Sequence, residues 1–489
     1  MTPEIITRKE YARAGTSHLQ LKVMKMKQTR RRFLKTSALA GLSPLLPQAA
    51  FAQSQRSRDL VAATSMLQLA PDVFPQTEVW SYDGVSPGPE IRLAQGARVQ
   101  KRLVNNLPEG TSVHWHGIRI DNAMDGVAGL TQDPAQPGET FDYDFQVPDA
   151  GTYWYHAHSR SYEQVGRGLY GPLIVEEAVA PDVDRDEVLV IDDWRLDGET
   201  AALIDSFEDA HDRSHAGREG NYFTTNSRPD YALDVKQGER LRLRVINAAN
   251  GRIFSLVTAG LDGWVMAYDG MPLETPEKLD GVFLLAPGQR VDLFVDVIAE
   301  QGESAYLARV EDDQGYALAA LVVTAISDAE PRGAPTPLPP NPMMDIPDLT
   351  DATPVTLNMA GGAMGNLQSA NLDGTELSAQ DLSDANMFWS FNGVVGLTDT
   401  PLARLSLNEV VRLKIVNDTA FAHAMHLHGM HFREVLEDGS FGPMRDTLLV
   451  FRGETREIAF VAHNPGKWLF HCHMLAHAAA GMITWLEIT

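Results

Sequence analysis

The chain repeats one pattern three times: GARVQKRLVN at residues 96–105, GERLRLRVIN at 238–247 and NEVVRLKIVN at 408–417. In each copy apolar and polar residues alternate over about eight positions, and an asparagine ends the stretch. Such alternation is typical of a β-strand that buries one face. A unit that returns three times in one chain predicts three domains of the same kind.

The rest of the chain agrees with an all-β fold class. Short alternating runs recur between turn residues, which is typical of β-sandwiches, and 489 residues suffice for about three domains. We therefore predict three consecutive β-sandwich domains, at about residues 58–178, 186–326 and 350–489. The intervening stretch 327–349 is rich in proline and is predicted to be a linker.

The first 52 residues have the pattern of an export signal. TRRRFLK at 29–35 precedes a mildly apolar stretch at 36–51, and Ala50-Phe51-Ala52 is a small-x-small cleavage site. This order is similar to that of a twin-arginine signal. Residues 1–23 are unlike its usual start, so translation from Met24 or Met26 is an alternative. We expect a periplasmic or extracellular protein, exported by the twin-arginine route.

Charge and cysteine usage exclude several classes of protein. The net charge of −24 has the wrong sign for a protein that binds nucleic acid. Beyond the signal, the sequence has no apolar run long enough to span a bilayer, so no stable membrane insertion is expected. Cys472 is the single cysteine of the chain and cannot form an intramolecular disulfide. Its role, if it has one, comes from its thiolate.

Histidines at positions i and i+2 occur at matching places in the first and third repeats. The four pairs are His114/His116, His156/His158, His426/His428 and His471/His473. Two pairs follow the repeat asparagine at the same distance, where the second repeat has Leu256 and Thr258 instead. On a strand, each pair points to one face. Because buried imidazoles need partners, the first and third domains are predicted to hold metal, and the second to be a spacer without ligands.

The segment around Cys472 predicts a different metal site. Cys472 lies between two of these histidines, so its side chain points to the opposite face of the strand. His477 and Met482 follow in the pattern Cys-x4-His-x4-Met, and His423 is the candidate for a second imidazole. A thiolate, two imidazoles and a weak thioether make a blue-copper site. An electron arriving there would pass through Cys472 to the neighbouring histidines.

Together these motifs resemble the multicopper oxidases, in particular the three-domain bacterial branch of laccase-like and periplasmic cuprous oxidases. The motifs are HWHG at 114–117, MDGVAGLTQDPAQPGE at 124–139, GTYWYHAH at 151–158, GLYGPLIV at 168–175, HAMHLHG at 423–429 and HCHMLAHAAAGM at 471–482. The resemblance covers nearly the whole chain after the signal. It implies cupredoxin-like Greek-key domains that bind four copper ions.

The resemblance also implies a role for each ligand. The type 1 copper would be held by His423, Cys472, His477 and the axial Met482. The type 2 copper would be held by His114 and His426. The type 3 coppers would be held by His116, His156 and His473 and by His158, His428 and His471. At this trinuclear cluster dioxygen would be reduced by four electrons to water.

The resemblance to this family also bears on proton delivery, where the sequence departs from the usual pattern. Asp125 stands where the family has a carboxylate near the type 2 copper, and reduction of dioxygen consumes protons. Ala478 occupies the place of an acidic relay residue in some bacterial relatives, so the proton route must differ here. Ala424 replaces a proline that usually follows the first type 1 histidine.

The electron donor is predicted from the surroundings of the type 1 site. Only a few methionines, rather than a methionine-rich insert, precede Phe388 there: Met359, Met364 and Met387. This favours an open site and laccase-like oxidation of phenols or aromatic amines. The alternative donor is Cu(I), in a cuprous oxidase for copper tolerance. A copper-sequestering or structural cupredoxin is an alternative of another class, whereas a copper nitrite reductase would lack the type 3 pair.

Four histidines of the chain after the signal remain outside these motifs: His211, His215, His431 and His463. The first two lie among charged residues and are expected at the surface. His431 is close in sequence to a ligand segment and could contact a substrate. Whether any of them forms a secondary metal site is left open, as is the oligomeric state.

Overall fold

The repeated stretches are strands of three different sheets in the structure, a computed structural model that describes residues 58–489. They are β4 (Arg98–Asn105), β12 (Arg240–Asn247) and β26 (Val410–Asn417), which confirms the strand prediction. Each lies between a parallel strand that precedes it and an antiparallel strand that follows it. The predicted export signal lies outside the described residues.

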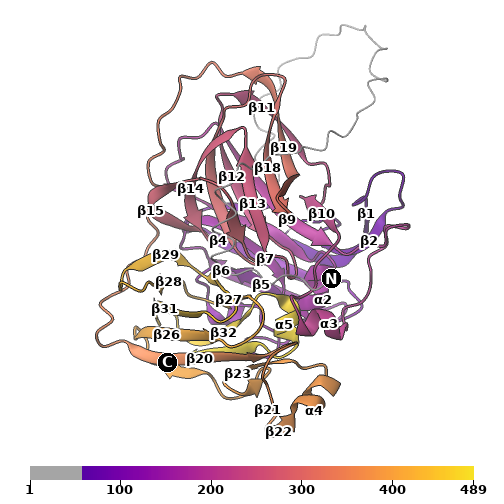
Figure 1. Cartoon of the computed structure of the whole chain (residues 1–489), viewed down its shortest axis with the longest axis vertical. Coiled ribbons are helices and arrows are strands. Elements are labelled where there is room, and N and C mark those ends of the chain that lie inside the picture. Colours follow the sequence, from indigo (N-terminus) through magenta and orange to yellow (C-terminus); the bar gives the residue numbers. More distant parts are fainter. Residues whose placement is uncertain (1–57) are drawn as a thin grey trace.

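The first pair of sheets is formed by residues 59–176, and we call it the first sandwich (Figure 1). One sheet has the order β2-β1-β4-β6 and adds β1 (Asp59–Leu67), β2 (Thr77–Tyr82) and β6 (Thr140–Gln146). The other has the order β3-β8-β7-β5 and consists of β3 (Ile91–Ala94), β5 (Val113–His116), β7 (Gly151–Ala157) and β8 (Tyr170–Glu176).

The second sandwich is formed by residues 185–326. One sheet has the order β10-β9-β12-β17-β14-β15, with β9 (Arg185–Trp194), β10 (Tyr222–Thr225), β14 (Leu261–Tyr268), β15 (Met271–Lys278) and β17 (Arg290–Val297). The other has the order β11-β19-β18-β13-β16, with β11 (Ala232–Gln237), β13 (Phe254–Ala259), β16 (Phe283–Leu285), β18 (Ser304–Glu311) and β19 (Gln314–Ile326).

The third sandwich is formed by residues 353–488. Its larger sheet has the order β22-β21-β24-β23-β20-β26-β31-β28-β29, with β20 (Thr353–Gly361), β21 (Ser369–Leu372), β22 (Thr375–Ser378), β23 (Trp389–Phe391), β24 (Val394–Val395), β28 (Phe432–Val435), β29 (Phe441–Arg445) and β31 (Thr455–Val461). The smaller has the order β25-β33-β32-β27-β30, with β25 (Ala403–Leu405), β27 (His423–Leu427), β30 (Thr447–Val450), β32 (Gly466–Cys472) and β33 (Ile483–Ile488).

Short helices lie in loops within the three sandwiches. They are η1 (Asn122–Met124), α2 (Ser161–Gly166), α3 (Ala210–Ser214), α4 (Ala379–Asp384) and α5 (Leu475–Ala479). Helices α2 and α3 both pack against α5, so all three sandwiches meet there, as Figure 1 shows. Within residues 58–489, no helix is long and apolar enough to cross a membrane. The all-β fold class is thus confirmed.

The asparagine that ends each repeat closes the loop after it. In Asn105, Asn247 and Asn417 the side-chain oxygen accepts a hydrogen bond from the backbone N–H two residues on. The side-chain amide donates to a carbonyl four or five residues on. All three asparagines are buried. The repeat therefore preserves a loop closure as well as a strand.

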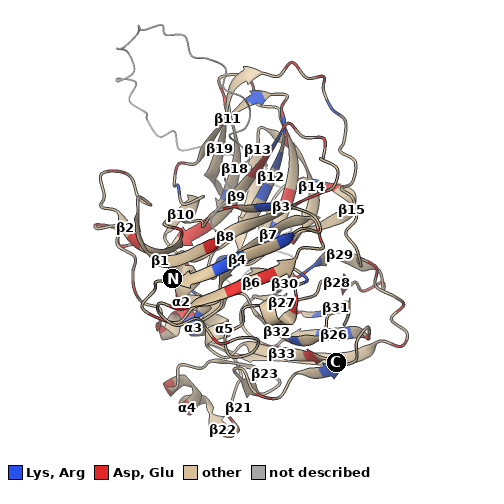
Figure 2. Ribbon diagram, turned by 180° about the vertical axis from the view of Figure 1, so that it is seen from behind, with Lys and Arg blue, Asp and Glu red and all other residues tan. Residues whose placement is uncertain are grey.

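The polar face of the repeat differs between the sandwiches. In the first, Arg98 and Arg102 of β4 pair with Asp144 and Asp142 of the neighbouring β6 at the surface, where Figure 2 shows the two colours side by side. In the second, every residue of β12 is buried. Its polar face is covered by the first sandwich rather than by solvent, which the alternation alone did not predict.

Buried arginines of β12 hold the second sandwich to the first. Arg242 forms ion pairs with Asp292 of its own sandwich and with Glu177, directly after β8. Arg244 donates to the hydroxyl of Thr152 on β7, at 2.9 Å. These paired charges satisfy the buried guanidinium groups. The first and third sandwiches share one continuous apolar core, and a smaller apolar cluster contains residues of all three sandwiches.

Candidate metal centres

The four histidine pairs converge between the first and third sandwiches. His114 on β5 lies opposite His156 on β7, and His426 on β27 lies opposite His471 on β32. Their partners His116, His158, His428 and His473 lie at or just beyond the ends of the same strands. All eight side chains are buried. The prediction that these pairs come together is confirmed.

Imidazoles from the two sandwiches stack on each other. The ring centroids of His114 and His428 are 3.8 Å apart, and those of His116 and His426 are 3.7 Å apart. Potential ligand atoms lie within 4.8 Å of one another in several triads: His114/His116/His156, His114/His426/His428, His158/His428/His471 and His116/His426/Asp446. The geometry thus offers overlapping three-ligand sets that need residues from both ends of the chain.

Many of the ring nitrogens in this cluster have no hydrogen-bond partner among the described residues. They are Nε2 of His114, His156, His158 and His426, Nδ1 of His116 and both nitrogens of His473. Burial, reinforced by neighbouring imidazoles, holds the pKa values of His156, His158 and His473 well below the usual value. Neutral imidazoles with unused lone pairs are the form in which histidine binds metal. The residues therefore fit a metal cluster.

Hydrogen bonds at the second nitrogen orient several of these rings. Nδ1 of His114, His156 and His471 donates to the main-chain carbonyls of Asp125, Ala157 and Cys472, at 2.9 to 3.0 Å. Each bond fixes the tautomer that leaves Nε2 free. The outer hydrogen bonds therefore prepare the rings for metal before any ion binds.

Asp125 bridges the two sandwiches at this cluster. Its carboxylate is fully buried and lies 3.2 Å from Nδ1 of His114 and 3.0 Å from Nδ1 of His428. These are the two rings that stack across the interface. The structure therefore places Asp125 beside the candidate ligands, where the resemblance expected a carboxylate.

Asp446 is a second buried carboxylate at the cluster, and the sequence reasoning missed it. It lies 3.2 Å from Nε2 of His116, and its backbone carbonyl accepts from Nδ1 of His426 at 3.0 Å. Burial alone would raise the pKa of Asp446, but the Arg290 guanidinium and the imidazoles outweigh burial and hold it well below the usual value. Arg290 belongs to the second sandwich, which therefore supports the cluster although its residues form none of the histidine triads.

The predicted thiolate site also forms. Cys472 Sγ lies 3.7 Å from Nδ1 of His423 and 3.7 Å from Nδ1 of His477, and these nitrogens are 3.1 Å apart. Burial raises the pKa of the Cys472 thiol to about 12, so its deprotonation needs a cation beside it. Met482 is fully buried, and its carbonyl accepts from the N–H of Cys472 at 3.1 Å. Three converging soft and borderline donors fit copper.

This site is covered, whereas the sequence favoured an open one. Both imidazoles are fully buried. Nε2 of His423 lies 2.7 Å from the hydroxyl of Thr419, and Nε2–H of His477 donates to the main-chain carbonyl of His215 at 2.6 Å. The Trp389 ring contacts both imidazoles. The cover arises because the loop around α3 of the second sandwich packs on the third, a contact between distant segments that no local pattern records.

The remaining histidines fall into two groups. His211 is exposed and His215 is partly exposed, near α3, so the surface prediction holds for this pair. His431 is buried, and burial lowers its pKa to about 3. His463 is partly buried and its Nδ1 donates to the carbonyl of Val461. In the described residues neither His431 nor His463 belongs to a group of potential metal ligands.

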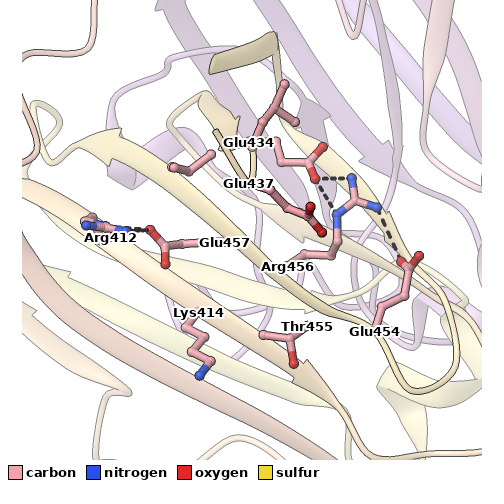
Figure 3. Close-up of a pocket in the computed structure, with 10 residues that line it drawn as sticks. Arg412, Lys414, Glu434, Glu437, Glu454, Thr455, Arg456 and Glu457 are labelled. Atoms are coloured by element: carbon pink, nitrogen blue, oxygen red, sulfur yellow. Dashed lines mark hydrogen bonds and ion pairs between the residues drawn. The ribbon is translucent and has the colours of Figure 1, made fainter. Parts of the chain in front are cut away.

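A surface hollow of about 550 Å³ lies away from the histidines, on the larger sheet of the third sandwich. Figure 3 shows ion pairs among its charged side chains. Arg456 binds Glu434 and Glu454, and Arg412 binds Glu457. None of its lining residues is a candidate ligand, so this hollow adds nothing to the metal chemistry.

The fold and the two sites define a copper oxidoreductase built of cupredoxin-like β-sandwiches. Sequence models of the multicopper oxidase family match residues 63–179, 186–327 and 370–489. The chain therefore belongs to the multicopper oxidase family, and copper is its cofactor.

Several relatives and solved structures are similar over nearly the whole chain. Multicopper oxidase MmcO of Mycobacterium tuberculosis is 30% identical, over 92% of this chain and 91% of its own. Copper resistance protein A of Escherichia coli is 25% identical, over 94% and 99%. The solved structure of Lac15 from a marine microbial metagenome is 40% identical, with a TM-score of 0.71, over 88% and 99%. That of a multicopper oxidase from Pseudomonas thermotolerans is 33% identical, with a TM-score of 0.76, over 88% and 98%.

Proposed function

We propose that the protein couples one-electron oxidation of a donor to four-electron reduction of dioxygen to water. His423, Cys472, His477 and Met482 would hold the type 1 copper. His114 and His426 would hold the type 2 copper, with His116, His156 and His473 and with His158, His428 and His471 holding the type 3 pair. The bound coppers would supply the redox chemistry at both sites. The single observation that carries the proposal is that one tripeptide belongs to both sites.

That tripeptide provides the electron path. Cys472 faces His423 and His477, whereas His471 and His473 face the histidine cluster. Two routes leave the Cys472 thiolate, one through each neighbouring peptide bond. A hydrogen bond of 2.9 Å from Nδ1 of His471 to the Cys472 carbonyl shortens one of them. Electrons taken singly at one site can therefore be delivered to the other.

Asp125 is the group that this proposal uses for protons. Water formation consumes four protons for each dioxygen, and a carboxylate beside the cluster can accept and release them. Asp125 is buried, contacts two ligand rings and belongs to the first sandwich. Ala478 provides no acidic group after His477. The other carboxylate at the cluster, Asp446, is held in an ion pair by Arg290, so we assign the role to Asp125.

The cover over the type 1 site favours Cu(I) as donor over phenols and aromatic amines. A phenol needs contact with an edge of a type 1 imidazole, and both imidazoles are buried. A small cation needs only a ligand on the segment that covers the site, because its electron can reach the type 1 copper through covalent and hydrogen bonds. Two of the similar proteins are named copper resistance protein A, which agrees with this donor. Phenols and aromatic amines are the second candidate, because the methionines before Phe388 are few.

The experiment is oxygen uptake by the copper-loaded protein, with Cu(I) or with a phenol, and with and without added Cu(II). Uptake with Cu(I) at one dioxygen for four donors is expected. Uptake with the phenol only when Cu(II) is added would identify copper as the real donor. Brisk uptake with the phenol alone would instead assign laccase activity.

We also propose that the protein acts after twin-arginine export, in the periplasm or outside the cell.

A further inference from the structure

The type 1 site has one bonded connection to the surface through the second sandwich. Nε2–H of His477 donates to the main-chain carbonyl of His215 at 2.6 Å. His215 is partly exposed, and its ring lies edge-to-face with Phe421, with centroids 5.8 Å apart. An electron that starts at the His215 side chain therefore reaches a type 1 ligand through its own main chain and one hydrogen bond.

A second imidazole lies against His215. His211 and His215 have ring centroids 3.9 Å apart and an angle of 10° between the rings. His211 belongs to α3, and His215 is the residue directly after it. Two histidines spaced four residues apart on one face of a helix are a common metal-binding pair. The side chain of Asp209 caps the helix by accepting from the N–H of His211, which fixes the first turn.

The hydrogen bonds of the pair leave nitrogens free for a ligand. Nδ1–H of His215 points to the carbonyl of His211, at 3.2 Å, and lies 3.0 Å from the hydroxyl of Ser214. This contact fixes the tautomer in which Nε2 carries the free lone pair. Among residues 58–489, no hydrogen bond engages Nε2 of His215 or the ring of His211. The pair is therefore oriented but not used by the fold.

Met364 follows a residue whose backbone is bonded to the segment that carries the histidine pair. The N–H of Ala363 donates to the carbonyl of Ser214 at 2.7 Å. This bond holds the backbone just before Met364 against the residue just before His215. Met364 is 70% exposed and has a backbone φ of 61°. Most of this long side chain is therefore open to solvent. Met359, by contrast, is fully buried in the core and unavailable.

We propose that His211 and His215, with Met364 as a third ligand, form the site where substrate Cu(I) binds and gives up its electron. This inference rests on the proposed function. Thioether donors select Cu(I), and imidazole donors also bind copper. The balanced reaction is 4 Cu(I) + O2 + 4 H+ → 4 Cu(II) + 2 H2O. Each Cu(I) loses one electron, which passes through His215 to His477.

The test uses the four-copper protein and Ag(I), a redox-inert substitute for Cu(I), measured by titration calorimetry. We expect one Ag(I) site in the unsubstituted protein. In His211→Ala and His215→Ala, which keep the main-chain carbonyl of residue 215, affinity should fall about tenfold or more. Met364→Leu should weaken binding less. Matched controls are Met343→Leu, at another exposed methionine, and His463→Gln, both of which should bind as the unsubstituted protein does.

Kinetics separates this site from the proposed function. In His211→Ala/His215→Ala, kcat/KM for Cu(I) should fall about tenfold or more, while oxygen uptake with hexacyanoferrate(II) and the type 1 absorption stay unchanged. Unchanged Ag(I) binding and unchanged Cu(I) kinetics would overturn the site and leave the oxidase intact. An equal loss with hexacyanoferrate(II) would also overturn it, because the defect would then lie in electron transfer generally. If the unsubstituted protein consumes no oxygen with either donor, the proposed function itself fails.

Discussion

Arg290 of the second sandwich and Asp446 of the third form a fully buried ion pair, with Nη2 and Oδ2 2.7 Å apart and Nη1 and Oδ1 2.9 Å apart. The same carboxylate touches His116, a candidate type 3 ligand. Through this ion pair the second sandwich, which supplies no histidine ligand, helps to position the histidine cluster.

Asp446→Asn should destabilise the protein and loosen the cluster. Removing the charge of Asp446 leaves the buried Arg290 with only its longer ion pair to Asp269, at 3.8 Å. We expect this to cost about 3 kcal/mol of unfolding free energy. The candidate type 2 ligand His426 bonds to the backbone of the same residue, so the type 2 signal in electron paramagnetic resonance should weaken while type 1 absorption stays. Denaturant unfolding and the spectrum check both. A normal type 2 signal would show that Asp446 does not position the ligands.

Cys472→Ser should abolish the intense visible absorption and donor oxidation together. A serine oxygen cannot supply the thiolate bond or the electron path. The histidine cluster does not use this side chain, so the copper content should fall by one ion only. Absorption spectra, metal analysis and oxygen uptake give the answer. Survival of either the colour or the oxidation would contradict the type 1 assignment.

Asp125→Asn should slow reduction of dioxygen without removing copper. The amide retains the shape of the carboxylate but cannot carry protons, so reoxidation of the fully reduced protein should slow by about 10- to 100-fold. Stopped-flow mixing with dioxygen measures this step directly. Reduction of the type 1 site by the donor serves as the internal control. If reoxidation stays fast, protons take another route.

Asp192→Asn should change how stability depends on pH. Burial, with the neighbouring Asp193 charge, raises the pKa of Asp192 to about 8. The folded protein therefore holds a proton that the unfolded chain loses near pH 4, and its unfolding free energy falls as pH rises from about 4 to 8. The variant lacks this fall, so at pH 8 its Tm should exceed that of the unsubstituted protein by about 2 °C or more.

Thermal unfolding of both proteins between about pH 5 and 8 checks this expectation. Asp133→Asn, at an exposed position, is the control and should follow the unsubstituted protein. Parallel pH curves for Asp192→Asn and the unsubstituted protein would show that Asp192 is ionised in the fold. In that case the Tyr170 hydroxyl, which donates to Asp192 at 2.5 Å, would donate to an ionised carboxylate.

Asn247→Ala should destabilise the second sandwich alone. The asparagine side chain satisfies Ala249 N–H and the carbonyls of Arg252 and Leu285. Leaving these buried groups without partners costs about 1–3 kcal/mol. Because the residue is not part of the metal sites, copper content and type 1 absorption should not change. Loss of copper in this variant would contradict the purely structural role of the repeat asparagine.

Features that depend on spacing along one strand could be predicted from the sequence. The alternation in residues 96–105 and its two copies predicted the three strands, and histidines two positions apart predicted shared faces. Cys472 between His471 and His473 predicted two sites back to back for the same reason. In each case neighbours in sequence decide which way a side chain points.

Features that depend on packing between distant segments could not be predicted. The contact between His215 and His477 joins residues 262 positions apart and closes a site that was expected to be open. Asp446 follows an ordinary strand and carries no motif, yet Arg290, 156 positions earlier, makes it part of the cluster. From the sequence, the arginines of β12 are expected to face solvent, because the sequence does not show which sandwich covers them.

The histidine cluster is divided between the two ends of the chain, from His114 to His473. A ribosome therefore finishes nearly the whole polypeptide before the first complete triad across the two sandwiches can exist. Fragments left by interrupted synthesis or by proteolysis between the sandwiches lack one half of the set. Oxygen chemistry is thereby restricted to intact molecules, and an unfinished chain has no means to generate partly reduced oxygen at this cluster.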